Sequence, residues 1–443
     1  MERTVSGRTP TGRTATRRGL LAGAGLVGVA AGLAACTSDK GSGGGTGGAT
    51  ESPKPDPNAA AATIVTPAKD ATGVSAATEI VYELKNATEA TVELKDANGT
   101  VVTGELRADG SSWVPAKTLG YSMAYTLTVT ATGSDGKTGT TTSGFTTMAK
   151  PSKTVRVTSF LGDNAKAGVG MPLMYKFSRA IPEAQRAEVQ KRLFVSSEPV
   201  QDGIWHWFSG TEVHYRPKEY WQAGTKVNAR LAIGGLDMGD GYYGKGDITL
   251  ENLTIGSAVI MVADNKTKQM TVTKDGKVVK KIPISLGKPS TPSSSGTVVI
   301  IEKFVHTIFD TYAELGPELG YRTPIDYAQR LTWGGEYIHS APWSISSQGK
   351  RNVSHGCLNM SPANAKWLFN LTSIGDPVIT KGTERQLKNG NGWTHWNMTW
   401  DEYVKGSAVP FVSAVTPTPA PSESESATPD PTASATATAT PSA

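Results

Sequence analysis

The chain has 443 residues, which predicts roughly three domains at about 150 residues per domain. Its formal charge of +5 looks basic, but residues 1–35 hold five arginines against one acid, and the remainder carries 39 basic and 38 acidic residues. This balance excludes the strongly basic surface that nucleic-acid binding needs.

Residues 1–35 are built like the signal peptide of a lipoprotein. A basic stretch ends at Arg17-Arg18, the apolar run "GLLAGAGLVGVAAGLAA" follows, and small residues precede Cys36. The run is short and glycine-rich for a membrane span, so we expect cleavage; an uncleaved anchor is the alternative. The small residues before Cys36 resemble a bacterial lipobox, which implies a lipid anchor on Cys36 at the outer face of the cell membrane. The paired arginines resemble a twin-arginine signal, and the choice between Sec and Tat export stays open.

Residues 36–58 are rich in Gly, Ser and Pro, and this composition predicts a flexible linker. Two strand-rich segments follow, at 59–149 and 150–254, in which apolar and polar residues alternate with period two. Asn98-Gly99 is typical of a hairpin turn. A weak internal similarity about 100 residues apart favours two β-sandwiches, and both segments resemble bacterial immunoglobulin-like modules.

The second of these segments contains "IWHWFSGTEVHY", with His206 and His214 in a strand pattern. No cysteine or carboxylate lies at a metal-binding spacing from them, so we expect packed or surface histidines and a stiffening role for the module.

Residues 255–381 are predicted to form a third, mostly β domain with one or two helices. Asp275-Gly276 indicates a hairpin turn, and "EYIHSAPW" is a short strand that ends at His339. We expect a helix only later, with Ser361 as its N-cap and Gly375 at its end. The chain is therefore predicted to be mainly β.

Residues 382–406 are too short to fold alone, and we expect their three tryptophans to pack back onto the third domain. Residues 407–443 repeat Pro, Thr, Ala and Ser, a composition that cannot bury a core and predicts a disordered tail.

Cys357, in "SHGCLNM", is one of only two cysteines. A lipidated Cys36 has no thiol, so a disulfide between the two is excluded. A lone thiol in an exported protein favours a nucleophile. Two alternatives remain: an inert buried cysteine, and a zinc site made by Cys357 with His339 and His355, whose spacing is unlike that of known zinc motifs.

A cysteine nucleophile needs a base, and two histidines are near it in sequence. His355 would lie about 7 Å away along an extended segment, whereas His339 can be brought alongside by the intervening loop, so we expect His339 to be the base. Ser340 can accept a hydrogen bond from the imidazole through its carbonyl. Gly356 allows a tight backbone path, and the N–H of Cys357 can stabilise an oxyanion.

The motif "HSAPW" followed by "SHGCLN" resembles the signature of the L,D-transpeptidases with a YkuD-type catalytic domain. The resemblance covers about 255–381, and the modules on either side resemble the layout of actinobacterial members. It implies that Cys357 is the nucleophile, that His339 is the general base and acid, and that Ser340 orients His339. Four further residues are implied to shape the site and its oxyanion hole: Ser354, His355, Gly356 and Asn359.

The same resemblance implies that Tyr321 contacts the substrate and supports the oxyanion, and that Tyr312 and Trp343 flank the acyl pocket; the lid sequence around Tyr312 departs from the family pattern. The implied reaction joins two diaminopimelate residues of peptidoglycan stem peptides in a 3→3 cross-link and releases D-Ala, without metal or cofactor. Carbapenems would acylate the thiol. Alternatives are an L,D-carboxypeptidase and a non-catalytic, wall-binding lipoprotein. We expect a monomer.

Overall fold

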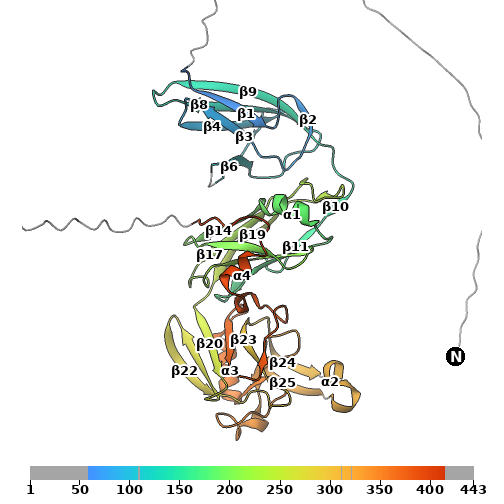
Figure 1. Ribbon diagram of the computed structural model, residues 1–443, viewed down its shortest axis with the longest axis vertical. Coiled ribbons are helices and arrows are strands. Elements are labelled where there is room, and N and C mark those ends of the chain that lie inside the picture. Colours follow the sequence, from blue (N-terminus) through green and yellow to red (C-terminus); the bar gives the residue numbers. More distant parts are fainter. Residues whose placement is uncertain (1–57, 108–109, 311, 321, 415–443) are drawn as a thin grey trace, which may run out of the picture. The chain divides into compact units, whose positions relative to one another are not determined.

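The computed structural model describes residues 58–414, except 108–109, 311 and 321. The predicted signal peptide, lipidated Cys36, the linker up to residue 57 and the tail from 415 lie outside the described residues. The described part contains four α-helices and twenty-nine strands, so the prediction of a mainly β fold is confirmed (Figure 1). No helix in this part is long and apolar enough to cross a membrane.

The first region is a set of strands between residues 61 and 147. A five-stranded sheet has the order β2-β9-β8-β4-β5, and β1 pairs with β3 and β6 with β7. The strands are β1 Ala61–Thr66, β2 Ala71–Val74, β3 Val81–Lys85, β4 Glu89–Asp96, β5 Val101–Val102, β6 Gly104–Leu106, β7 Trp113–Pro115, β8 Ala124–Thr132 and β9 Thr138–Thr147. The predicted Asn98-Gly99 turn joins β4 to β5, with Gly99 at a φ of +80° that favours glycine.

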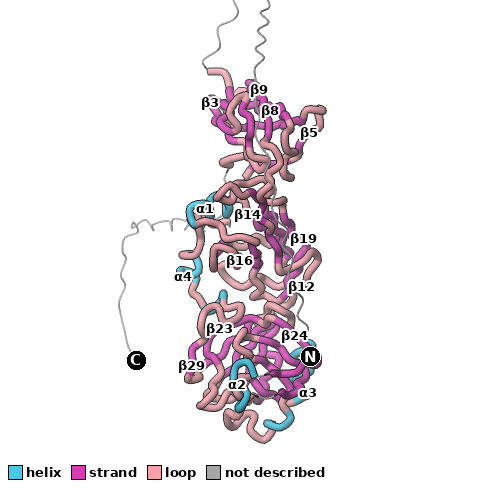
Figure 2. The backbone as a smooth tube through the Cα atoms, turned by 90° about the vertical axis from the view of Figure 1, so that its right-hand side faces the viewer, coloured by secondary structure: helices cyan, strands magenta, loops and turns pink. Residues whose placement is uncertain are grey.

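The second region pairs two four-stranded sheets, ordered β11-β13-β16-β15 and β12-β19-β17-β14 (Figures 1 and 2). Its elements are β10 Thr154–Val155, β11 Val157–Ser159, β12 Lys166–Ala167, β13 Leu173–Phe177, α1 Glu183–Gln190, β14 Leu193–Glu198, β15 Gly203–Trp207, β16 Glu212–Pro217, β17 Lys226–Leu231, β18 Tyr243–Gly244 and β19 Ile248–Ile255. Alternate residues of these strands fill one core around the buried Tyr175, Phe177 and Trp221. The helix α1 was not expected from the strand pattern of this segment.

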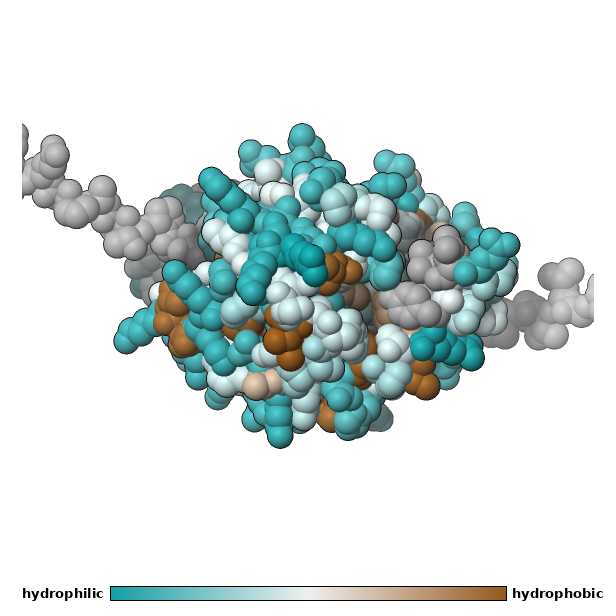
Figure 3. Space-filling view, turned by 90° about the horizontal axis from the view of Figure 1, so that it is seen from below, coloured by the Kyte–Doolittle hydropathy of each residue, from teal (hydrophilic) through white to brown (hydrophobic). Residues whose placement is uncertain are grey.

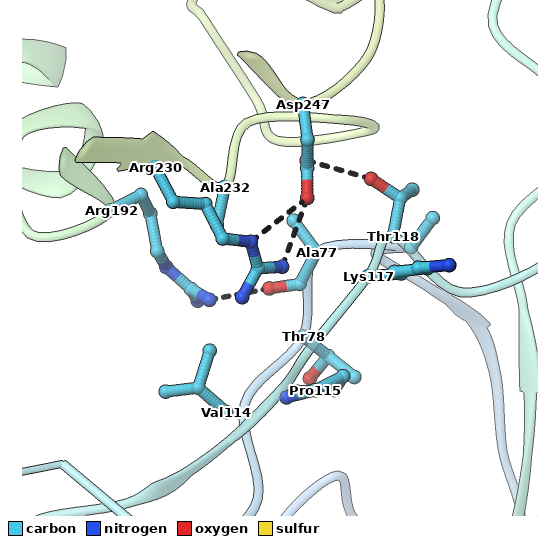
Figure 4. Close-up of a pocket in the computed structure, with 11 residues that line it drawn as sticks. Ala77, Thr78, Val114, Pro115, Lys117, Thr118, Arg192, Arg230, Ala232 and Asp247 are labelled. Carbon is cyan, nitrogen blue, oxygen red and sulfur yellow. Dashed lines mark hydrogen bonds and ion pairs between the residues drawn. The ribbon is translucent and has the colours of Figure 1, made fainter. Parts of the chain in front are cut away.

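Polar contacts connect the first region to the second. Thr118 Oγ1 donates to Asp247 Oδ1 at 2.8 Å, and Arg230 Nη2 donates to Asp247 Oδ2 at 2.9 Å. Arg192 Nη1 donates to the carbonyl of Ala77 at 2.6 Å. These side chains crowd the small pocket drawn in Figure 4, whose free volume of about 10 Å³ is too small for a ligand.

The third region has a six-stranded sheet, β22-β21-β20-β28-β23-β29, and a four-stranded sheet, β24-β25-β26-β27. Its elements are β20 Val259–Asp264, β21 Gln269–Lys274, β22 Lys277–Pro283, β23 Ser294–Val299, β24 Glu302–Asp310, α2 Tyr312–Leu319, β25 Arg322–Arg330, β26 Tyr337–Ser340, β27 Leu358–Met360, α3 Pro362–Leu371, β28 Pro377–Lys381 and β29 Arg385–Gln386. The two sheets and α3 share one apolar core. The end of the molecule at the bottom of Figure 1 is mostly hydrophilic, with hydrophobic side chains in small separate groups (Figure 3).

Local sequence signals in this region have mixed outcomes. The Asp275-Gly276 turn is confirmed, with both residues at positive φ between β21 and β22. Ser361 caps α3, because its side chain accepts from the N–H of Asn364 at 3.4 Å. The predicted end of this helix at Gly375 is wrong: α3 ends at Leu371. We expected helices in this region only after the cysteine motif. This is also wrong, because α2 precedes the motif.

The C-terminal segment, 382–406, holds β29, the short 3₁₀ turn η2 (His395–Asn397) and α4 (Trp400–Val404). We expect its tryptophans to pack onto the third domain, and Trp393 shares a core with Val299 and Ile301 of that domain, but the tryptophans also contact the second region. Trp393 meets Phe160 edge-on at 4.6 Å between ring centroids. Trp396 donates its indole N–H to the carbonyl of Gly170 at 2.7 Å. The segment also stays attached to the third region through the pairing of β29 with β23, so it connects both.

A cluster of histidines lies where this segment meets the second region. His206 and His214 are direct partners across β15 and β16. His214 Nδ1 lies 2.8 Å from His395 Nε2, and His206 Nδ1 donates to the Tyr403 carbonyl at 2.7 Å. The Phe208 ring lies within 4.4 to 5.1 Å of all three imidazoles, measured between centroids. These histidines pack against aromatic rings.

Candidate active site

The parallel pairing of β26 with β27 builds the site. Ile338 pairs with Leu358 and His339 pairs with Asn359. Asn359 and His339 are therefore direct neighbours across the two strands, and Cys357 lies in the bend just before β27. The loop between the two strands thus returns the cysteine motif to the strand that carries the histidine.

Cys357 is buried, with 5% of its surface exposed. Its Sγ lies 3.7 Å from the carbonyl oxygen of Gly335, to which the thiol donates. Burial raises the pKa of the thiol to about 12; the N–H of Tyr337 opposes this rise, and the charge of Glu336 adds to it. The resting site therefore holds a neutral thiol.

His339 is also buried, and one hydrogen bond sets its tautomer. Nδ1 lies 2.8 Å from the Ser340 carbonyl oxygen. A carbonyl can only accept, so Nδ1 carries the hydrogen and Nε2 of the neutral ring is free to take a proton. Burial lowers the pKa of His339, and the Ser340 carbonyl and the Asn359 side chain partly oppose this shift. The imidazole is neutral at pH 7 and can accept a proton.

The turn before Cys357 is held by serine hydroxyls. Ser354 Oγ donates to the Cys357 carbonyl at 2.7 Å and accepts from the Gly356 N–H at 3.1 Å. Ser293 Oγ donates to the Gly356 carbonyl at 2.7 Å. Gly356 has a φ of +123°, where an L side chain would be strained. These contacts fix the direction in which the Cys357 side chain leaves the backbone.

His355 and Asn359 occupy different surroundings. His355 is exposed, and its Nε2 lies 3.1 Å from Lys288 Nζ, which donates to it. Burial and the Lys288 charge lower the pKa of His355. Asn359 is buried, its Nδ2 donates to Ser344 Oγ at 3.4 Å, and its backbone bonds to Ser285. Asn359 is therefore packed beside His339 between the strands, whereas His355 lies at the surface.

The three residues expected to contact substrate differ in position. Trp343 is 59% exposed, and its ring centroid lies 6.0 Å from that of His339. Tyr312, at the start of α2, is 45% exposed and lies under the Arg322 guanidinium. Tyr321 lies outside the described residues. The structure thus places only Trp343 directly beside the histidine.

Two charged residues near the cysteine were missed. Glu336, one residue before β26, is buried and accepts from Arg385 Nη2 at 2.6 Å. Arg385 belongs to no recognisable motif, and the two residues are 49 positions apart in the sequence, so no local pattern indicates their pairing.

Metal ligation finds no support in the geometry. Among the residues that the structure describes, no group of three or more His, Cys, Asp or Glu side chains is placed to hold a metal ion. His339, His355 and Cys357, the ligands of the zinc alternative, do not form such a group.

Two parts of the chain match models of known protein families. Residues 71–237 match the family Big_10, described as a bacterial Ig domain, and residues 258–380 match YkuD, described as an L,D-transpeptidase catalytic domain.

Relatives of known name agree with these matches. L,D-transpeptidase 2 of Mycobacterium tuberculosis is 34% identical over 414 residues, which cover 90% of this chain and 97% of that protein. L,D-transpeptidase 5 of the same species is 32% identical, over 78% of this chain and 76% of its own. A solved L,D-transpeptidase from Mycobacterium smegmatis is 31% identical, covers 52% of this chain and 99% of its own, and has a TM-score of 0.42. This chain belongs to the L,D-transpeptidase family, whose members are acyltransferase-type enzymes.

Proposed function

We propose that the protein forms 3→3 cross-links between diaminopimelate residues of peptidoglycan through an acyl-enzyme on Cys357. The observation that carries this proposal is the tautomer of His339. Its Nδ1–H is bonded to the Ser340 carbonyl, so the unprotonated Nε2 is available to accept a proton.

The first step is attack of Sγ on the carbonyl of diaminopimelate at position three of a donor tetrapeptide. The S–C bond forms as the thiol proton passes to His339 Nε2. The C–N bond to D-Ala then breaks, and His339 returns the proton to the departing amine. A thioester on Cys357 and free D-Ala result.

The second step resolves the thioester. The side-chain amine of a second diaminopimelate attacks the acyl carbon and gives its proton to His339. The C–S bond breaks, the sulfur takes the proton back, and the cross-linked peptide leaves. No oxidant, reductant or cofactor is consumed.

The two pKa directions support proton transfer during attack. Burial raises the pKa of the Cys357 thiol and lowers that of His339, so both the thiol and the imidazole are neutral before substrate binds. A preformed thiolate–imidazolium pair would need the opposite shifts. We therefore propose that the thiolate forms only as the substrate carbonyl is attacked.

The oxyanion of each tetrahedral intermediate needs donors. The Gly356 N–H already bonds to Ser354 Oγ, so we assign this task to the Cys357 N–H, with the Tyr321 hydroxyl as its partner. Tyr312 and Trp343 would flank the acyl chain.

The wider assignment follows the same reasoning. The relatives are L,D-transpeptidases, so the chain is expected to act on the cell wall outside the cytoplasm. We propose a lipid anchor on Cys36, a monomer, and the domain limits given by the sequence: 59–149, 150–254 and 255–381. If water replaced the acceptor amine, the same site would act as an L,D-carboxypeptidase.

The test is intact-mass spectrometry of the full chain carrying Cys36→Ser, incubated with a carbapenem. We expect one adduct, absent from the Cys357→Ala variant. No adduct on the parent chain would exclude the acyl-enzyme. A disaccharide tetrapeptide then distinguishes the activities: a dimer with loss of D-Ala supports the transpeptidase, and a tripeptide alone supports the carboxypeptidase.

A further inference from the structure

An ion pair lies directly behind the cysteine turn. Glu336, whose side chain is 7% exposed, accepts from Arg385 Nη2 at 2.6 Å, and Arg385 is 47% exposed. Ser294 joins both: its N–H and Oγ donate to the Glu336 carboxylate at 3.1 and 2.6 Å, and its Oγ accepts from Arg385 Nε at 3.1 Å. These hydrogen bonds hold both side chains of the ion pair in place.

The pair touches the backbone that carries the nucleophile. A Cβ placed on Gly356 would lie 3.6 Å from Glu336 Cγ and 3.7 Å from Arg385 Nη2. On the other strand, the Cys357 thiol donates to the carbonyl of Gly335, the residue just before Glu336. The ion pair therefore lies against the backbone of the residue that directly precedes Cys357.

A carboxylate in this place opposes the chemistry of the thiol. A like charge disfavours ionisation of a neighbouring acid, and burial weakens the screening by water. Attack by Cys357 builds negative charge on sulfur. An uncompensated Glu336 would therefore repel that charge, and the Arg385 guanidinium cancels most of this field.

We propose that Arg385 is a positioning residue of the cysteine site, which neutralises Glu336 behind the Gly356–Cys357 turn so that the carboxylate does not oppose ionisation of the nucleophile. This inference rests on the proposed function, because it gives Cys357 a nucleophilic role. Arg385 reaches the site from β29, where it pairs with Ser294 of β23. The C-terminal segment would thus contribute to catalysis as well as to packing.

The experiment measures the rate of Cys357 alkylation by iodoacetamide against pH, in the full chain with Cys36→Ser. Arg385→Gln should move the profile to higher pH by about one unit, which is about a tenfold slower reaction at neutral pH. Arg385→Lys keeps the charge and should keep the profile. The double variant Glu336→Gln/Arg385→Gln removes both charges and should return the profile to that of the parent.

The control for loss of a positive charge is Lys381→Gln, at the exposed end of β28, which should not move the profile. An Arg385→Lys chain that reacts as slowly as Arg385→Gln would show a merely structural role and overturn the inference, because lysine keeps the positive charge. A double variant whose alkylation profile does not return to that of the parent chain would also overturn the inference. Alkylation does not depend on transpeptidation, so the two proposals can fail separately. A chain that forms no carbapenem adduct but shows the shifted alkylation profile would overturn the proposed function, whereas the effect of Arg385 on Cys357 would still be supported.

Discussion

Acid should loosen the contact between the C-terminal segment and the second region, because two neutral histidines are buried there. Burial lowers the pKa of His214 from 6.5 to about 3 and that of His395 well below its usual value. Both groups have a folded pKa below the unfolded one, so their contribution to stability is complete above about pH 6.5 and is lost as the pH falls from there towards the folded pKa.

The magnitude follows from the linkage between proton binding and folding. His214 removes up to about 1.4 kcal/mol of unfolding free energy per pH unit, hence about 2 kcal/mol between pH 7 and pH 5, and His395 acts in the same direction. Asp376 acts in the opposite sense, because burial raises the pKa of this carboxyl to about 7; it gains about 2 kcal/mol over the same range. The histidine contribution is therefore measured as a difference between variants.

The assay is denaturant unfolding at pH 7 and pH 5, followed by the fluorescence of the tryptophans around this cluster. On acidification, the double variant His214→Gln/His395→Gln should lose less unfolding free energy than the parent chain, by about 2 kcal/mol from His214 and by a further amount from His395, although it starts less stable. His306→Gln, a substitution of an exposed histidine on β24, serves as the matched control. Equal pH dependence in the parent and the double variant would refute the assignment of the acid sensitivity to this pair.

Three further outcomes are expected. Acylation of Cys357 by a carbapenem should hold its rate down to below pH 6.5, because burial lowers the pKa of His339; a fall already at pH 7 in the stopped-flow rate would contradict a neutral resting imidazole. Leu368→Ala should cost about 2–5 kcal/mol in denaturant unfolding, because this leucine of α3 is fully buried, and a loss below 1 kcal/mol would mean that the site collapses around the gap. Ser361→Ala should cost about 1 kcal/mol by removing the cap of α3, whereas Ser361→Asp should restore it.

Predictions from local sequence patterns were the most reliable. The turns at Asn98-Gly99 and Asp275-Gly276 were predictable because positive φ restricts the residues that fit there. The start of α3 was predictable because Ser361 followed by proline is a strong N-terminal signal. The end of α3 was not: Thr372 ends it through a tertiary bond to Gln329 on β25, and no local pattern announces that partner.

The candidate site was predictable only as far as its motif. The spacing of His339 and Cys357 led to the two strands that the structure pairs. The roles of the other motif residues, such as Ser354 and Asn359, stay predictions. Arg385 could not be found, because its contact with Glu336 depends on the register of β29 against β23 rather than on any local sequence.

The return of residues 382–406 to the second region bears on how such a chain can be recombined. A single crossover near residue 255 would give Trp396 a new neighbour in place of the Gly170 carbonyl, and Trp393 a new neighbour in place of Phe160. Residues 382–406 therefore have partners in both regions, because β29 also pairs with β23 of the third region. A chimera that keeps all of these contacts has to exchange the second region, the third region and the C-terminal segment together.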